Sequence, residues 1–310
     1  MISDRITNKN KWKYVAILLF ITLAPNVKAQ TQLFSYTQFM NNLTPLNPAY
    51  SLLDKAGSVS SLVREQWVGV DGAPVTYLLN GNLPLESINS AAGSTVFYDS
   101  FGVEHQAEAN VYFAKAIQLG EKNYLGVSMN AGIRNYVANY SQLGSADPLF
   151  VNDVRNTKPN VGFGIIYYSD WYYLGISVPE LTITSLGTAS IQNKANFRNN
   201  YYFSGALITN LNDEDFKLKP AVLFTYANGI PLIADLSATI IIKNMLGLGM
   251  DYRTNNELAG ILTLSIGTFQ IGYSYQSGTS PENLGAFNVS THEVSLIYRF
   301  GSGASKPRIL

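Results

Sequence analysis

Short stretches of strictly alternating apolar and polar residues recur along most of this chain, and they constrain its fold more than any other feature. In the last of them, residues 291–300, Val294 and Tyr298 fall on one parity, whereas Glu293 and Arg299 fall on the other. Successive side chains of a β-strand point to opposite faces, so each stretch predicts a strand with one apolar and one polar face. The polar parity mixes glycines with charges of both signs, which suits a wet lumen better than a dry core.

Turn residues between these stretches divide the chain into about fourteen predicted strands. No later segment is long and apolar enough to predict a transmembrane helix, because the nearest candidate, Ile230–Ile242, is interrupted by Asp235 and Ser237. Strands that face lipid must close into a barrel, since only helices and closed sheets satisfy their backbone polar groups there. The predicted strands lie near residues 58–66, 75–83, 91–99, 106–118, 124–137, 160–168, 172–178, 201–210, 216–227, 232–242, 246–253, 257–266, 269–276 and 291–300.

The lengths of the predicted connections indicate how such a barrel is oriented. The three longest, 138–159, 179–200 and 277–290, follow the fifth, seventh and thirteenth predicted strands. In an even-stranded outer-membrane barrel with both termini periplasmic, connections after odd-numbered strands are extracellular and are the longer ones. The sequence therefore predicts an all-β fold, a transmembrane antiparallel β-barrel of about fourteen strands with both termini periplasmic. Pro220 removes a hydrogen-bond donor inside one predicted strand, which suggests a bulge there.

The N-terminus has the sequence pattern of a secretory signal peptide. Three lysines precede the apolar run Tyr14–Leu23, and Val27 and Ala29 supply a small-x-small ending. This pattern predicts cleavage after Ala29, with an uncleaved anchor as the alternative. Four segments are then expected: a signal peptide at 1–29, an irregular lead-in at 30–55 that lies in the periplasm or plugs the lumen, a barrel at 56–300, and a tail at 301–310.

Composition excludes several classes of function. Only 14% of residues are charged, and the chain contains 20 Tyr, 15 Phe and no Cys. Without cysteine there is no disulfide framework and no thiolate metal site. Residues 1–29 hold five Lys/Arg and one Asp, so the remainder carries a small excess of acidic groups, and no basic surface points to nucleic acid.

Aromatic residues gather near the ends of predicted strands, as in the girdles of membrane barrels at the two lipid–water boundaries. Ordinary packing is the alternative interpretation. The residues concerned are Trp67, Trp171, Tyr172, Tyr173, Tyr201 and Tyr202.

The chain offers little that could carry catalysis. Its two histidines, His105 and His292, have no partner at metal-ligand spacing, and no nucleotide-binding or nucleophile-elbow motif is present. No cofactor is expected, and the chain is expected not to be an enzyme; a Ser–His membrane hydrolase is the minor alternative. The charged residues on the polar face of the predicted strands, which would face the lumen, either form a charged pathway or pair with opposite charges across neighbouring strands, and pairing is favoured. They are Glu108, Arg134, Lys217, Lys219, Asp235, Asp251 and Arg253.

Several sequence motifs resemble the PorP/SprF family, outer-membrane proteins of the type IX secretion system and gliding machinery of the Bacteroidota. The most specific is Arg64–Pro74, sequence REQWVGVDGAP, and matching pieces follow in order along nearly the whole chain after residue 29. The further pieces are NPAY at 47–50, LPL at 83–85, YYSDWY at 167–172, KLKP at 217–220, GIPL at 229–232, YRT at 252–254 and HEVSLIYRF at 292–300.

The resemblance implies an accessory barrel in the outer membrane lipid that helps to export or anchor large adhesin-like cargo carrying a type IX C-terminal signal. It also implies contact with periplasmic, peptidoglycan-associated subunits and a possible link to gliding motility. A passive or hydrophobic-substrate channel is the alternative function. Cargo contact is expected at Trp67 and the turn Asp71, Gly72 and Pro74, which would otherwise be girdle and connector. Periplasmic contact is expected at Asn47, Pro48 and Tyr50, which would otherwise plug the lumen.

Overall fold

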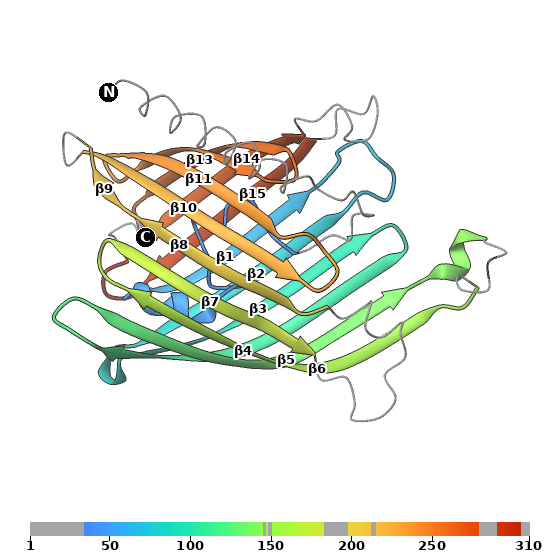
Figure 1. Ribbon diagram of the computed structural model, residues 1–310, viewed down its shortest axis with the longest axis horizontal. Helices are drawn as coiled ribbons and strands as arrows, with labels where there is room; N and C mark the ends of the chain where they lie inside the picture. The colour runs from blue at the N-terminus through green and yellow to red at the C-terminus, as the bar shows by residue number, and fades with distance from the viewer. Residues whose placement is uncertain are drawn as a thin grey trace, which may run out of the picture.

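The strands close into one antiparallel barrel (Figure 1). The computed structural model describes residues 34–144, 147, 151–182, 198–211, 215–278 and 290–304. Fifteen strands form a single sheet in which successive strands pair, apart from two that share one partner, and the first strand pairs with the last from Gly57↔Phe300 to Glu65↔His292. In Figure 1 the blue first strand accordingly lies beside the red last strand.

The bounds of the elements agree closely with the predicted strands. Three short 3-10 helices accompany them: η1 (Pro48–Leu53), η2 (Glu86–Ile88) and η3 (Tyr140–Leu143). The strands are β1 (Gly57–Glu65), β2 (Val75–Leu85), β3 (Ser90–Phe101), β4 (Glu104–Gln118), β5 (Tyr124–Ala138), β6 (Val154–Tyr168), β7 (Tyr172–Thr182), β8 (Asn200–Leu207), β9 (Thr209–Asn210), β10 (Phe216–Ala227), β11 (Ile233–Ile242), β12 (Leu246–Arg253), β13 (Glu257–Ile266), β14 (Phe269–Gly278) and β15 (Ser290–Phe300).

Strands β8 and β9 together occupy one strand position in the wall of the barrel, here called a stave. Both pair with β10 in the same register, as Ala221↔Ala206 and Leu218↔Thr209. The fifteen strands therefore form fourteen staves, which confirms the predicted antiparallel barrel of about fourteen strands. The break between β8 and β9 also accommodates Pro220, which keeps its pairing to Ala238 on the β11 side. A bulge was expected at Pro220. Instead, the neighbouring strand is interrupted between β8 and β9, beside Pro220.

The two ends of the barrel differ in their connections. Gly57 and Phe300 are paired, so the first and last strands start and finish at the same end. That end, here called the turn end, carries the short connections 86–89, 119–123, 169–171, 211–215, 243–245 and 267–268. The opposite loop end carries the three longest connections, 139–153, 183–199 and 279–289, as the sequence predicts.

The hairpin of β5 and β6 stands out beyond the rest of the loop end, at the right of Figure 1. Strand β6 begins at Val154, six residues before its predicted start at residue 160. Its first residues pair in register with β5, and Tyr136 and Ala138 form a small buried cluster with Tyr140 and Val154.

The two faces of the barrel wall differ as the alternating sequence requires. On β4, Val111 is 65% exposed and Phe113 is 47% exposed, whereas Glu108 and Tyr112 are buried. The same alternation recurs on the other staves, so the outer surface carries an apolar belt, and charged side chains such as Glu108, Arg134 and Asp235 point inward. Among the described residues, no helix is long and apolar enough to cross a membrane.

A charge placed in the middle of this belt should weaken the fold. We expect Val111→Arg to lower the free energy of unfolding by about 2–4 kcal/mol, because an arginine near the bilayer midplane loses its hydration. Denaturant unfolding of the refolded barrel in lipid measures the change. The same substitution at Val70, which is 40% exposed in the loop between β1 and β2, should change it by less than about 0.5 kcal/mol. Equal effects at the two positions would contradict a lipid-facing belt at β4.

Candidate functional site

Residues 34–56 run through the lumen of the barrel. The segment starts beside the loop-end half of the wall, where the Tyr202 hydroxyl donates to the Phe34 carbonyl at 2.8 Å. It descends to the turn end, where Asp54 forms a salt bridge with Arg299 at 2.6 Å, and then continues into β1. Phe34, Leu52 and Leu53 are partly buried, and seven further apolar side chains are fully or almost fully buried: Tyr36, Phe39, Met40, Leu43, Leu46, Ala49 and Tyr50.

An apolar patch of the inner wall receives this segment. The buried side chains of the segment form one cluster with inward-facing residues of β1, β2, β3, β6, β7, β8, β10 and β13. Fully burying a Leu, Phe or Met side chain contributes about 1.5–3 kcal/mol. The segment therefore fills the lumen and forms a hydrophobic core there together with the inner wall. The largest wall residues in the cluster are Leu62, Leu78, Phe97, Ile166, Tyr168, Tyr173, Tyr202, Leu223 and Ile261.

The carboxylate of Glu293, on β15, holds the start of the segment. It accepts hydrogen bonds from the backbone amides of Thr37 at 2.7 Å and Gln38 at 3.1 Å. It also forms a buried salt bridge with Arg64, its direct partner across β1 and β15. Ser274 donates to the same carboxylate at 3.2 Å. This completely buried charge is thus paired and hydrogen-bonded, as a buried charge must be.

Asn47 fixes the turn-end half of the segment. Its side-chain oxygen caps η1 by accepting from the Ala49 amide at 3.1 Å, and its amide nitrogen donates to the Ile165 carbonyl of β6 at 3.2 Å. Two wall glycines make room for this side chain, because a Cβ on Gly164 would lie 2.2 Å from the Asn47 oxygen and one on Gly175 would lie 2.8 Å from its nitrogen. Segment and wall are therefore fitted to each other.

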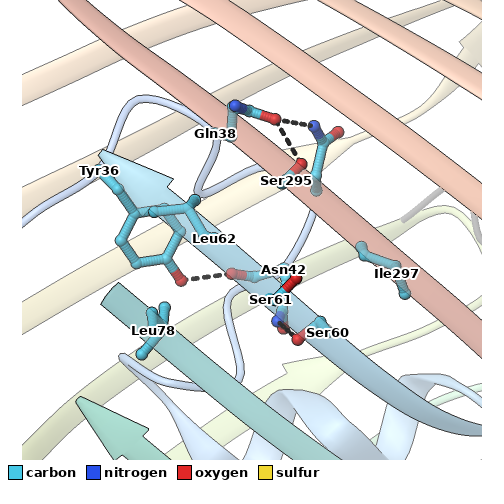
Figure 2. A pocket seen from close by; sticks show the side chains of 10 residues that line it. Tyr36, Gln38, Asn42, Ser60, Ser61, Leu62, Leu78, Ser295 and Ile297 are labelled. Atoms are coloured by element: carbon cyan, nitrogen blue, oxygen red, sulfur yellow. Dashed lines mark hydrogen bonds between the residues drawn. The ribbon is translucent and has the colours of Figure 1, made fainter. Parts of the chain in front are cut away.

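Figure 2 shows the region where the segment meets β1, β2 and β15. Ser295 donates to the Gln38 side chain at 2.7 Å, and Asn42 donates to Ser60 at 2.8 Å. The Tyr36 hydroxyl donates to the Asn42 carbonyl. In this region a cavity of about 20 Å³ lies between segment and wall, enough for about one water molecule.

The inward charges pair across neighbouring strands. Glu108↔Arg134 and Asp235↔Arg253 are direct partners in the β-sheet register, and both pairs form salt bridges, at 3.1 and 2.6 Å. Arg134 also binds Glu180 at 3.1 Å. The interpretation of the lumen charges as cross-strand pairs is confirmed for these groups. Lys219 instead donates to the Met40 carbonyl of the lumen segment at 2.7 Å.

At the loop end, residues 66–74 form a tight, hydrogen-bonded loop between β1 and β2. The Gln66 amide donates to the Pro74 carbonyl at 2.9 Å, and the Gly102 amide of the β3–β4 turn donates to the Gly72 carbonyl at 2.8 Å. Gly72 has a φ of +72° and approaches Gly102 so closely that a Cβ would lie 3.2 Å from its Cα. Glycine is required on both counts.

The side chains of this loop divide into an inner and an outer set. Trp67 is half-buried and packs edge-on against Phe101, with ring centroids 6.0 Å apart, and Pro74 is buried. Asp71 is exposed, as are Val68 and Val70. Of the four residues expected at a cargo contact, only Asp71 and Gly72 are therefore at the surface. The valines between Trp67 and Asp71 are the exposed apolar groups that the sequence argument passed over.

The chain matches the model of the type IX secretion system membrane proteins PorP/SprF over residues 28–298. It belongs to this family. The match covers most of the chain, and it includes the lumen segment, the loop at 66–74 and all the barrel strands. No curated protein sequence matches the chain.

Solved structures similar to this PorP/SprF protein are outer-membrane barrels of low sequence identity. The outer membrane protein Omp33 of Acinetobacter baumannii is 10% identical, with a TM-score of 0.47, and the match covers 80% of this chain and 99% of Omp33. The monoaromatic hydrocarbon channel TodX, as a ΔS2S3 mutant, is 10% identical, with a TM-score of 0.47, covering 83% and 93%. Family and fold together place the protein in the outer membrane as a component of type IX secretion.

Asn47, Pro48 and Tyr50 of this PorP/SprF protein lie inside the barrel and are buried. In this position they cannot touch a periplasmic subunit, and they fill the lumen, which was the alternative interpretation. Residues 30–55 were expected to be an irregular lead-in. The buried apolar side chains from Tyr36 to Tyr50 mostly recur every three positions, and this spacing indicates a segment with a buried apolar face.

Both histidines lie on the outer face near the loop end, each beside an exposed tyrosine. The His105 ring is 3.2 Å from the Tyr98 hydroxyl, and the His292 ring is 2.8 Å from that of Tyr273 and 3.3 Å from the Ser290 hydroxyl. The Ser–His contact faces a tyrosine hydroxyl instead of the carboxylate that orients the histidine of a hydrolase. Family and fold are those of a secretion component and not of a known enzyme class. Among the described residues, no group of three or more His, Cys, Asp or Glu side chains could hold a metal ion.

Proposed function

We propose that this barrel is a docking protein of the type IX system, which holds adhesin-like cargo at the cell surface through the cargo's C-terminal signal. Membership of the PorP/SprF family carries this proposal. In it, cleavage after Ala29 releases the chain for insertion, the turn end faces the periplasm, and the loop end faces outward. A link to gliding motility belongs to the same proposal, because surface adhesins are the parts that move against a substrate.

The loop at 66–74 is the cargo contact in this proposal. Two features support it: its backbone is braced against the β3–β4 turn, and it presents Val68 and Val70 beside the exposed Asp71. A rigid loop loses little conformational entropy on binding, and apolar groups at the centre of an interface contribute most of its affinity. Trp67 and Pro74 position the loop, and Gly72 allows its close approach to Gly102.

The turn end is where periplasmic, peptidoglycan-associated subunits would bind. Asn47, Pro48 and Tyr50 are too deeply buried for this contact unless the lumen segment leaves the barrel. The proposal therefore assigns the contact to exposed groups of the short connections, among them Glu121, Lys122 and Asp170. The alternative, a passive or hydrophobic-substrate channel, receives no support from a lumen that contains residues 34–56.

The docking role predicts a selective loss of binding when the loop is altered. We expect Val70→Asp to reduce co-purification of the secreted adhesin, and its amount on intact cells, by about 10-fold or more, because it places a charge in the apolar contact. Leu232→Asp, a matched change at an exposed residue of another loop-end connection, should leave both unchanged. Comparison of surface proteomes, with barrel levels checked by immunoblot, gives the result. Normal cargo levels in cells lacking the whole barrel would refute the proposal.

A further inference from the structure

The lumen segment touches the wall on nearly every side. Side-chain hydrogen bonds join it to β1 through Ser60, to β6 through Ile165, to β7 through Ser177 and to β13 through Thr263. Further hydrogen bonds join it to β8, β10 and β15. These staves lie all round the circumference of the barrel. Thr37 also donates to Gln276 of β14 at 3.0 Å, so the segment is bonded to eight of fourteen staves and bridges the lumen instead of lining one side of it.

The wall is shaped for this segment at several separate points. Besides Gly164 and Gly175 at Asn47, a Cβ on Gly272 would lie 2.0 Å from the Gln38 side-chain oxygen, and one on Gly126 would lie 2.7 Å from the Leu52 side chain. None of these glycines has a positive φ, so what they allow is the close approach of the segment together with neighbouring side chains of the wall.

Apolar residues on the inner wall indicate that the segment stays in place. Leu62, Leu78 and Phe97 lie among the inward residues that the segment covers, and they would face water if it left. A lumen that opened regularly would be expected to carry polar residues there, as water-filled barrels do. Near this patch, the cavity between segment and wall has room for about one water molecule.

We propose that residues 34–54 are a resident plug, that the wall is a specific binding site for this segment, and that no solute or polypeptide passes through the lumen of the intact barrel. This inference does not depend on the docking role. It implies that cargo of the type IX system passes this protein by another route. It also implies that the barrel without its plug is a channel that a peptide of the plug sequence can close.

Conductance in planar lipid bilayers tests the proposal. The full chain should give no current steps, and a variant lacking residues 34–54 should conduct. A synthetic peptide of residues 34–54 should block that current, whereas a scrambled peptide of the same composition should not. Steps of equal size from the full chain and the deletion variant would overturn the proposal. So would a deletion variant that is folded, as judged by its heat-modifiable gel mobility, yet silent.

Point variants keep the test decisive if the deletion variant does not fold. Gly272→Leu places a side chain where Gln38 lies, so it should produce current steps in the full chain. Gly260→Leu is the matched control, because a Cβ at Gly260 meets nothing within 4 Å. This variant should give no current steps. The chain has no cysteine, so thiol labelling supplies a second readout. Ala49→Cys should react with a bulky maleimide at least 100-fold more slowly than Val70→Cys, and equal rates would overturn the proposal.

Discussion

Replacing Glu293 with alanine is expected to lower the free energy of unfolding by about 3–5 kcal/mol, one of the two largest effects of any single substitution proposed for this barrel. The change leaves the buried guanidinium of Arg64 without its ion-pair partner, and breaking a buried pair on one side only is strongly destabilising. It also removes the acceptor for the amides of Thr37 and Gln38. Equilibrium unfolding in urea, followed by tryptophan fluorescence in lipid vesicles, measures the loss.

A double substitution separates the charge from the packing. Arg64→Met combined with Glu293→Met removes both charges, so it should be less damaging than Glu293→Ala alone. Both variants should also loosen the plug, because the two amides of the lumen segment lose their acceptor in each. A loss below about 1 kcal/mol for Glu293→Ala would show that the carboxylate is not an anchor of the segment.

A loss of similar size, about 3–5 kcal/mol, is expected for Arg134→Met on the opposite side of the lumen. Arg134 binds Glu108 and Glu180 at 3.1 Å each and donates to Thr182 at 3.0 Å, so its removal strands two buried carboxylates. Methionine is of similar length and keeps most of the packing. The same urea titration gives the value.

Arg155→Met is the matched control for Arg134→Met. Arg155 lies on β6 in the projecting hairpin and is exposed, so its substitution should change the free energy of unfolding by less than about 0.5 kcal/mol. If the two arginines prove equally important, or equally dispensable, the cross-strand pairs inside the lumen are not what stabilises this wall.

The staves were predictable because one face of each meets lipid. Along β12 the alternation is unbroken, and the predicted bounds 246–253 of β12 and 257–266 of β13 match those observed. Where a strand leaves the lipid, the signal disappears. The first residues of β6, from Val154 to Pro159, carry polar side chains on both faces, and only pairing with β5 shows that they are strand. The local sequence does not predict that pairing.

The candidate site was less accessible to sequence reasoning. The alternation of Glu108 and Arg134 placed both charges on the inner face, but only the register between β4 and β5 makes them partners. Asn47 illustrates the same limit more sharply. Its cap on η1 is a local feature that sequence can suggest, whereas its place between Gly164 and Gly175 depends on strands more than a hundred residues away.

Occupation of the lumen changes how a secretion barrel of this family is understood. A protein whose interior is filled by its own chain acts through its two rims and its outer surface. At the loop end the braced loop 66–74 is the most sharply defined rim feature among the described residues, and at the turn end the pair Asp54–Arg299 ties the plug to the last strand. Partners on the two sides of the membrane would then be linked through the plugged barrel and not through an open pore.

Cross-linking between the lumen segment and the wall tests the central claim most directly. In this cysteine-free chain, Asn41→Cys paired with Thr263→Cys introduces two thiols at side chains whose polar atoms lie 3.2 Å apart. A short thiol-to-thiol reagent should join them in nearly every folded molecule in native outer membranes, as efficiently as it joins Ser60→Cys to Asn80→Cys on neighbouring strands. Efficient cross-linking of the strand pair without any cross-linking of Asn41→Cys to Thr263→Cys would show that residues 34–56 do not occupy the barrel.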